Sequence, residues 1–220
     1  MSRIRAWVSR ALLRVLHRTL PEGLYKFHGL ILYLPRGVFN PLLTLSTSLI
    51  LDVLDKLKPE GQILDYGCGS GIIAIYAAKS FEGVRKVIGI DVNPLTVATA
   101  RVNARLNSVE EKTLFLPSSK TLIEYPVGLV VSNPPYLPLK RLDTLDLNWC
   151  AGEDLMVIRE VIITSSRILR SGGGLLITYS SLTGPNRVES LLVENGFKIK
   201  DRWDKPTPLD TVFVAYAEKT

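Results

Sequence analysis

The sequence is poor in the residues that hold metals or form disulfides. Its 220 residues include two cysteines, Cys68 and Cys150, and two histidines, His17 and His28. Neither cysteine has a Cys or His neighbour at metal-ligand spacing, and a disulfide framework needs more cysteines. This scarcity predicts no metal site and a reducing, cytoplasmic setting for the protein.

Long apolar runs, low-complexity tracts and blocks of like charge are also missing. No stretch approaches the ~20 apolar residues that span a bilayer, so we expect at most a peripheral relation to membranes. Hydrophobic residues make up 46% and charged residues 22% of the chain, as in ordinary globular proteins. A chain of this length normally closes around one core, which excludes a second large module.

Positive charge is concentrated at the start of the chain. The net charge is +6, and residues 1–58 hold nine Lys or Arg against three acids, whereas the rest is balanced. Apolar residues recur at helical spacing over residues 3–19 with arginines between them, which predicts an amphipathic basic helix. We expect residues 1–36 to form a basic helical extension that helps to capture an acidic substrate and takes no part in chemistry.

From residue 60 onward, short apolar runs alternate with helical segments. This alternation predicts an α/β fold with a Rossmann-like parallel sheet. The last two predicted strands, residues 197–200 and 212–216, are separated by a short turn that contains proline. Because a parallel connection needs a crossover helix, these two strands are expected to form a terminal antiparallel hairpin.

A glycine-rich loop follows the first of these strands. Residues 65–71 read Asp-Tyr-Gly-Cys-Gly-Ser-Gly, and Asp91 ends the next strand. Alternating glycines let the backbone approach a ligand at a helix N-terminus, and the second carboxylate can accept both hydroxyls of a ribose. The spacing differs from the G-x-G-x-x-G of dinucleotide sites, and Asp65 would repel a pyrophosphate. It suits a cationic sulfonium ligand such as S-adenosylmethionine. Cys68 is expected to be a small buried residue of the loop.

A second motif, Asn-Pro-Pro-Tyr at residues 133–136, follows the fourth strand. The two prolines prevent the strand from continuing, so the peptide carbonyls turn outward. The side-chain oxygen of Asn133 and the carbonyl of Pro134 can then accept both hydrogens of one planar NH₂ group and stabilise the positive charge that develops on its nitrogen. Tyr136 offers a flat face for the substrate group. A simple turn at the end of the strand is the alternative interpretation.

The two motifs together resemble those of class I S-adenosylmethionine-dependent methyltransferases, whose fold is a seven-stranded Rossmann-like sheet. The Asn-Pro-Pro-Tyr motif is similar to that of enzymes that methylate adenine N6, other exocyclic base amines or glutamine in release factors. Residues 151–160 and 38–41 resemble segments of the release-factor glutamine (HemK-like) methyltransferase family. The resemblance implies that residues 37–220 form the methyltransferase domain.

The resemblance also implies a role for each motif residue. The place that often holds an adenine-binding acid falls on Ser118 or Ser119. The residues expected to act in catalysis are Asn133, Pro134, Pro135 and Tyr136. Those expected to bind S-adenosylmethionine are Asp65, Gly67, Cys68, Gly69, Gly71, Asp91, Val92, Ser118 and Asn133.

The substrate that these motifs favour is a protein glutamine amide in a translation release factor. Little chain remains outside the predicted core for a module that would flip and recognise a base in DNA. The alternative is an RNA methyltransferase for an exocyclic amine such as adenine N6 or guanine N2, binding RNA through the basic N-terminal region. The sequence leaves open whether a small activating subunit is needed.

Overall fold

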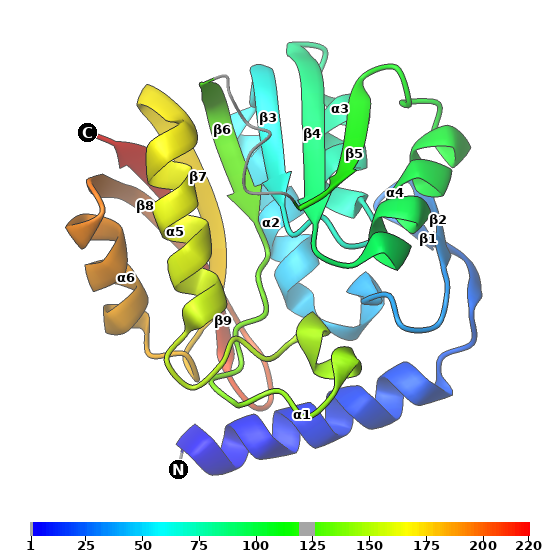
Figure 1. The fold of residues 1–220 in the computed structure, drawn as a ribbon, viewed down its shortest axis with the longest axis vertical. Helices are drawn as coiled ribbons and strands as arrows, with labels where there is room; N and C mark the ends of the chain where they lie inside the picture. Colours follow the sequence, from blue (N-terminus) through cyan, green and yellow to red (C-terminus); the bar gives the residue numbers. More distant parts are fainter. Residues whose placement is uncertain (1, 119–125) are drawn as a thin grey trace.

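The computed structural model describes residues 2–118 and 126–220 and has a central sheet between two layers of helices (Figure 1). The sheet has the strand order β5-β4-β3-β6-β7-β9-β8. The predicted Rossmann-like seven-stranded sheet is therefore confirmed. The strands are β3 (Gly61–Tyr66), β4 (Val84–Asp91), β5 (Thr113–Pro117), β6 (Val127–Ser132), β7 (Leu169–Ser180), β8 (Phe197–Pro206) and β9 (Thr211–Lys219).

The predicted terminal hairpin is also confirmed, because β8 and β9 pair antiparallel. β9 lies between β7 and β8 and runs antiparallel to both, whereas the pairs among β5, β4, β3, β6 and β7 are parallel. The carboxyl ends of the parallel strands consequently meet at one edge of the sheet. The order of the strands reverses there between β3 and β6, the place where open α/β sheets bind ligands.

Each face of the sheet is covered by its own group of helices and its own apolar core. Helices α2 (Leu45–Leu57), α3 (Ile72–Ser80) and α4 (Pro94–Leu106) share one buried cluster, and α5 (Met156–Ile168) and α6 (Pro185–Glu194) share the other. The strands between them carry apolar residues on both faces, as expected of strands covered on both sides.

A short hairpin of β1 (Gly23–Phe27) and β2 (Leu30–Leu34) precedes the sheet and was not predicted from the sequence. Two asparagines, Asn103 within α4 and Asn107 at its C-cap, attach the hairpin to the domain, and each pairs with both backbone groups of one β2 residue. Asn103 exchanges hydrogen bonds of 2.7 and 3.1 Å with Tyr33, and Asn107 exchanges bonds of 3.1 and 2.7 Å with Ile31. These side chains take the place of a neighbouring strand, which no local sequence pattern predicts.

The basic N-terminal segment forms helix α1 (Ser2–Thr19), which lies along the edge of the molecule where the parallel strands end (Figure 1). Arg10 and Arg14 face the domain and reach Asp146, which is fully buried and belongs to the short 3₁₀ helix η2 (Thr144–Asn148). Ala6 is buried against the segment that follows Tyr136. Among the described residues, no helix is long and apolar enough to cross a membrane.

Candidate functional site

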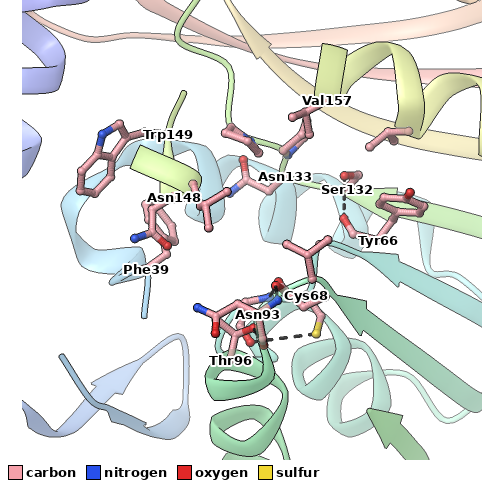
Figure 2. Close-up of a pocket in the computed structure, with 18 of the residues that line it drawn as sticks. Phe39, Tyr66, Cys68, Asn93, Thr96, Ser132, Asn133, Asn148, Trp149 and Val157 are labelled. Carbon is pink, nitrogen blue, oxygen red and sulfur yellow. Dashed lines mark hydrogen bonds between the residues drawn. The ribbon is translucent and has the colours of Figure 1, made fainter. Parts of the chain in front are cut away.

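A cavity of about 220 Å³ opens at the carboxyl ends of the parallel strands. Figure 2 shows Asn133, Asn148, Trp149 and Phe39 on one side of it and Cys68, Asn93 and Thr96 on the other. Most of the predicted site residues line this cavity. Those that line it are Gly67, Cys68, Gly69, Asp91, Val92, Ser118, Asn133, Pro134, Pro135 and Tyr136.

Two predicted residues, Asp65 and Gly71, do not line the cavity. Asp65 is fully buried and does not line the cavity. Gly71 begins α3 and packs closely on α4, because a Cβ on it would lie 2.8 Å from Cβ of Ala100. Ser119 lies outside the described residues, whereas Ser118 donates its backbone N–H to the carbonyl of Asp91 at 2.6 Å.

The glycine-rich loop forms an open cradle under the cavity. The backbone N–H groups of Gly67 and Cys68 donate to the carbonyl of Ile90 at 2.8 and 2.9 Å. A Cβ on Gly67 or Gly69 would meet no atom within 4 Å, and both residues have a positive φ, of 77° and 52°. Glycine is needed here for the backbone conformation and leaves the space above the loop free for a ligand.

Asp91 is held in place by the loop and by the start of α4. One carboxylate oxygen accepts the backbone N–H of Gly69 at 2.9 Å, and the other accepts that of Asn93 at 2.9 Å. Asn93 in turn caps α4, since its side chain accepts the N–H of Leu95. A carboxylate oxygen can accept more than one hydrogen bond, so both oxygens can also receive the hydroxyls of a ribose.

Asn133 has an amide whose two ends have different surroundings. Its Nδ2 donates to the hydroxyls of Ser46 and Thr47, each at 3.2 Å, in the first turn of α2. Its Oδ1 is buried and has no hydrogen-bond partner. A buried carbonyl oxygen without a partner costs about 1–3 kcal/mol, so a ligand N–H that reached it would be bound favourably.

The other residues of the Asn-Pro-Pro-Tyr motif line the cavity beside Asn133. Pro134 is buried, and the carbonyl of Tyr136 accepts the hydroxyl of Thr183 at 3.0 Å. Burial, together with the charge of Asp210, raises the pKa of the Tyr136 hydroxyl well above its usual value, so this hydroxyl stays neutral. Tyr136 can therefore offer a neutral aromatic surface to a substrate group.

Several wall residues were not found from the sequence. Ser46 and Thr47 follow the segment 38–41, but nothing local indicates that they bond to Asn133, which is more than 80 residues away. Trp149 lines the cavity and donates its indole N–H to Asp146 at 3.2 Å. Leu13 of α1 also lines the cavity, so the N-terminal helix borders the site.

Known proteins are similar in sequence to this chain. A family model described as ribosomal protein L11 methyltransferase (PrmA) matches residues 45–143. A Methanocaldococcus jannaschii protein named as a candidate protein N5-glutamine methyltransferase is 32% identical over 200 residues, covering 87% of this chain and 97% of its own length. The chain belongs to the class I S-adenosylmethionine-dependent methyltransferases. The L11 methyltransferase of Alteromonas mediterranea is 34% identical over 119 residues, which are 53% of this methyltransferase and 39% of the relative.

Solved structures share the fold. The L11 methylase of Lactobacillus delbrueckii aligns with a TM-score of 0.62 at 21% identity, covering 83% of this methyltransferase and 82% of that chain. Geranyl diphosphate methyltransferase in complex with S-adenosylmethionine aligns with a TM-score of 0.56 at 14% identity, covering 79% and 84%. A tRNA m1G37 methyltransferase of M. jannaschii gives 0.65 at 16% identity, covering 91% and 57%.

The cofactor of this methyltransferase is S-adenosylmethionine, and the cavity suits it. The open cradle over Gly67 and Gly69 leaves room for an extended ligand, and Asp91 presents a carboxylate beside it. When bound, this cofactor supplies an electrophilic methyl group on a sulfonium. The residues described here would bind it and orient the atom that receives the methyl group.

Asp65 makes the stability of the methyltransferase depend on pH. One of its oxygens accepts the N–H of Ala74 and the other has no partner, and burial raises its pKa to about 7 from an ordinary value of 3.8. The folded state therefore keeps this proton over a range where the unfolded state loses it. We expect the free energy of unfolding to fall by about 4 kcal/mol as the pH rises from about 4 to about 7, and Asp65→Asn to remove that loss.

Urea unfolding of both proteins at several pH values measures this effect. The difference between them isolates Asp65 from the other carboxylates, which titrate in both proteins. Parallel curves for the two proteins would show that Asp65 is ionised in the folded state throughout.

Proposed function

We propose that this methyltransferase transfers a methyl group from S-adenosylmethionine to the side-chain amide nitrogen of a glutamine, and that the substrate is a translation release factor. The observation that carries the proposal is the buried and unpartnered Oδ1 of Asn133 in the cavity wall. A carboxamide NH₂ is a donor that fits such an acceptor.

The chemistry of an amide explains why this acceptor matters. The amide nitrogen is a poor nucleophile, because its lone pair is delocalised into the carbonyl. During transfer the nitrogen forms a bond to the methyl carbon while the carbon–sulfur bond breaks, and positive charge grows on the N–H groups. An acceptor that already faces them stabilises that charge without reorganising. The methylated nitrogen then releases a proton to solvent.

Asn133 is oriented for this role by its own hydrogen bonds. Ser46 and Thr47 take the two N–H bonds of Nδ2, which leaves Oδ1 for the substrate. Tyr136, whose hydroxyl is neutral, lines the same cavity as Asn133. A planar amide can lie against an aromatic ring at little cost in entropy, which favours a flat substrate group over a tetrahedral amine.

The lengths over which the relatives align with this chain support a protein substrate. The candidate glutamine methyltransferase of M. jannaschii aligns over 97% of its length, so the similarity includes the region after Asn133. The L11 methyltransferase family model matches residues 45–143, which hold both motifs, and the Alteromonas mediterranea relative is covered over only 39% of its length. Similarity to tRNA methyltransferases is limited to the fold.

Labelled S-adenosylmethionine tests the proposal against its alternatives. The methyltransferase is incubated separately with purified release factor, ribosomal protein L11 and total RNA, each with Asn133→Ala as a control. We expect label on a glutamine of the release factor, located by mass spectrometry of peptides. Label on L11 would replace the proposed substrate, and label recovered only as a methylated base would favour the RNA alternative and overturn the proposal.

A further inference from the structure

Helix α1 turns its apolar side away from the domain. An amphipathic helix on a globular protein normally buries its apolar stripe. Here the large apolar side chains are exposed, with Ile4 at 69%, Val8 at 47% and Leu12 at 48% of their full exposure. The residues that form this apolar stripe are Ile4, Trp7, Val8, Leu12, Val15 and Leu16.

The opposite side of the helix fixes this orientation. Arg14 pairs with Asp143 and Asp146, and Arg10, itself 4% exposed, lies 3.6 Å from a carboxylate oxygen of Asp146. Ala6 is fully buried. Rotating the helix to bury the stripe would break this buried ion-pair network, and an uncompensated buried charge is costly. The stripe therefore stays exposed in the isolated chain.

The charged side chains of α1 itself all have one sign. α1 holds five arginines and no acidic residue. The acidic neighbours Asp143 and Glu153 are already paired with Arg14 and Arg3. Among the described residues, Arg5 and Arg18 are exposed and form no ion pair, and they stand near opposite ends of the stripe.

We propose that α1 lies in the surface of an anionic phospholipid membrane, with the apolar stripe among the acyl chains and Arg5 and Arg18 at the lipid phosphates. A straight amphipathic helix with arginines beside an apolar face and a tryptophan at its border is suited to this position. α1 forms the outermost layer at the lower edge of Figure 1, so the helix can lie flat on a plane.

A second copy of the chain is a poorer occupant of the stripe. Pairing α1 with another α1 would bring two helices together that each carry five arginines and no acid, and like charges across an interface are unfavourable. An anionic lipid surface supplies both the apolar phase and the opposite charge. Because Leu13 on the inner side of α1 lines the cavity, this position would hold the active site next to the membrane.

Flotation with vesicles of phosphatidylglycerol and phosphatidylcholine in equal parts tests the proposal, and it requires no methyl acceptor. We expect the full chain to float with these vesicles at low salt, and Val8→Ser/Leu12→Ser to bind at least ~10-fold more weakly. The matched control is Val102→Ser/Leu106→Ser on α4, where the same spacing carries side chains exposed at 42% and 41%. This control should bind as the unmodified protein does.

The charge contribution is tested in the same assay. Arg5→Ser/Arg18→Ser, vesicles of phosphatidylcholine alone and high salt should each reduce flotation, because screening and loss of opposite charge weaken an electrostatic contact. Thermal unfolding confirms that each variant is folded.

The proposal is overturned if the unmodified protein stays in solution with anionic vesicles, or if the α1 and α4 variants bind alike. A dimer in light scattering that Val8→Ser/Leu12→Ser dissociates, without vesicle binding, would assign the stripe to a second copy. None of these outcomes depends on which substrate is methylated.

Discussion

Replacing Asn133 by alanine is expected to lower the rate of methyl transfer at least ~100-fold while leaving the Kd for S-adenosylmethionine nearly unchanged. The substitution removes Oδ1, the buried acceptor that has no partner inside the protein. An acceptor of this kind acts on the charge that develops in the transition state, so its loss should reduce kcat. Single-turnover measurements with the acceptor identified by labelling, combined with calorimetry of the cofactor, separate the two effects.

A matched variant distinguishes the chemistry of Oδ1 from the shape of the site. Ser46→Ala/Thr47→Val retains Asn133 but removes both acceptors of its Nδ2. With these bonds lost, the amide can rotate and present either end to the substrate, so we expect a smaller fall in kcat than in Asn133→Ala, of about 10-fold. Equal rates for the unmodified protein and for Asn133→Ala would refute the role assigned to Asn133.

Asp91→Ala is expected to weaken binding of S-adenosylmethionine by about 100-fold. Its carboxylate would accept two charge-assisted hydrogen bonds from the ribose hydroxyls, and together these bonds are worth about 3 kcal/mol. The carboxylate holds the backbone of Gly69 and of Asn93 and presents acceptors to the ribose. Its removal should loosen the cradle as well as delete the ribose contact. Isothermal titration calorimetry with S-adenosylmethionine and with S-adenosylhomocysteine measures the change.

Asp201→Ala is a suitable control, since Asp201 is exposed on β8 at the far end of the sheet from the glycine-rich loop. It should bind the cofactor as the unmodified protein does. Asp91→Asn keeps one acceptor oxygen and should give an intermediate Kd. An unchanged Kd in Asp91→Ala would mean that the cofactor is held without this carboxylate.

Local sequence patterns were sufficient to predict the parallel sheet, its terminal hairpin and the positions of Gly67, Gly69 and Asp91 at the cavity. Each of these features depends on residues that are close in the sequence. Alternating apolar runs and helical segments determine βαβ units, a turn of a few residues requires an antiparallel pair, and glycine after a strand determines the shape of the loop. The Asn133 motif follows the same rule, since two prolines end β6 at the sheet edge where the cofactor loop lies.

The tertiary structure decided features that combine distant residues. Asp65 was expected beside the cofactor, but it lies beneath the loop, because it accepts the N–H of Ala74 inside α3. The hydroxyls that orient Asn133 come from the first turn of α2, and the β1–β2 hairpin is attached by two asparagines in and just after α4.

The amphipathic pattern of α1 was visible in the sequence, and the side that faces the domain was not. Hydrophobic periodicity locates an apolar stripe but gives no information on what lies opposite it. The buried carboxylate of Asp146, about 130 residues later, pairs with Arg10 and Arg14 and so turns the charged side inward. Because an unpaired buried charge costs more than an exposed apolar stripe, this long-range ion-pair network determines the orientation of α1, and only the folded chain brings its members together.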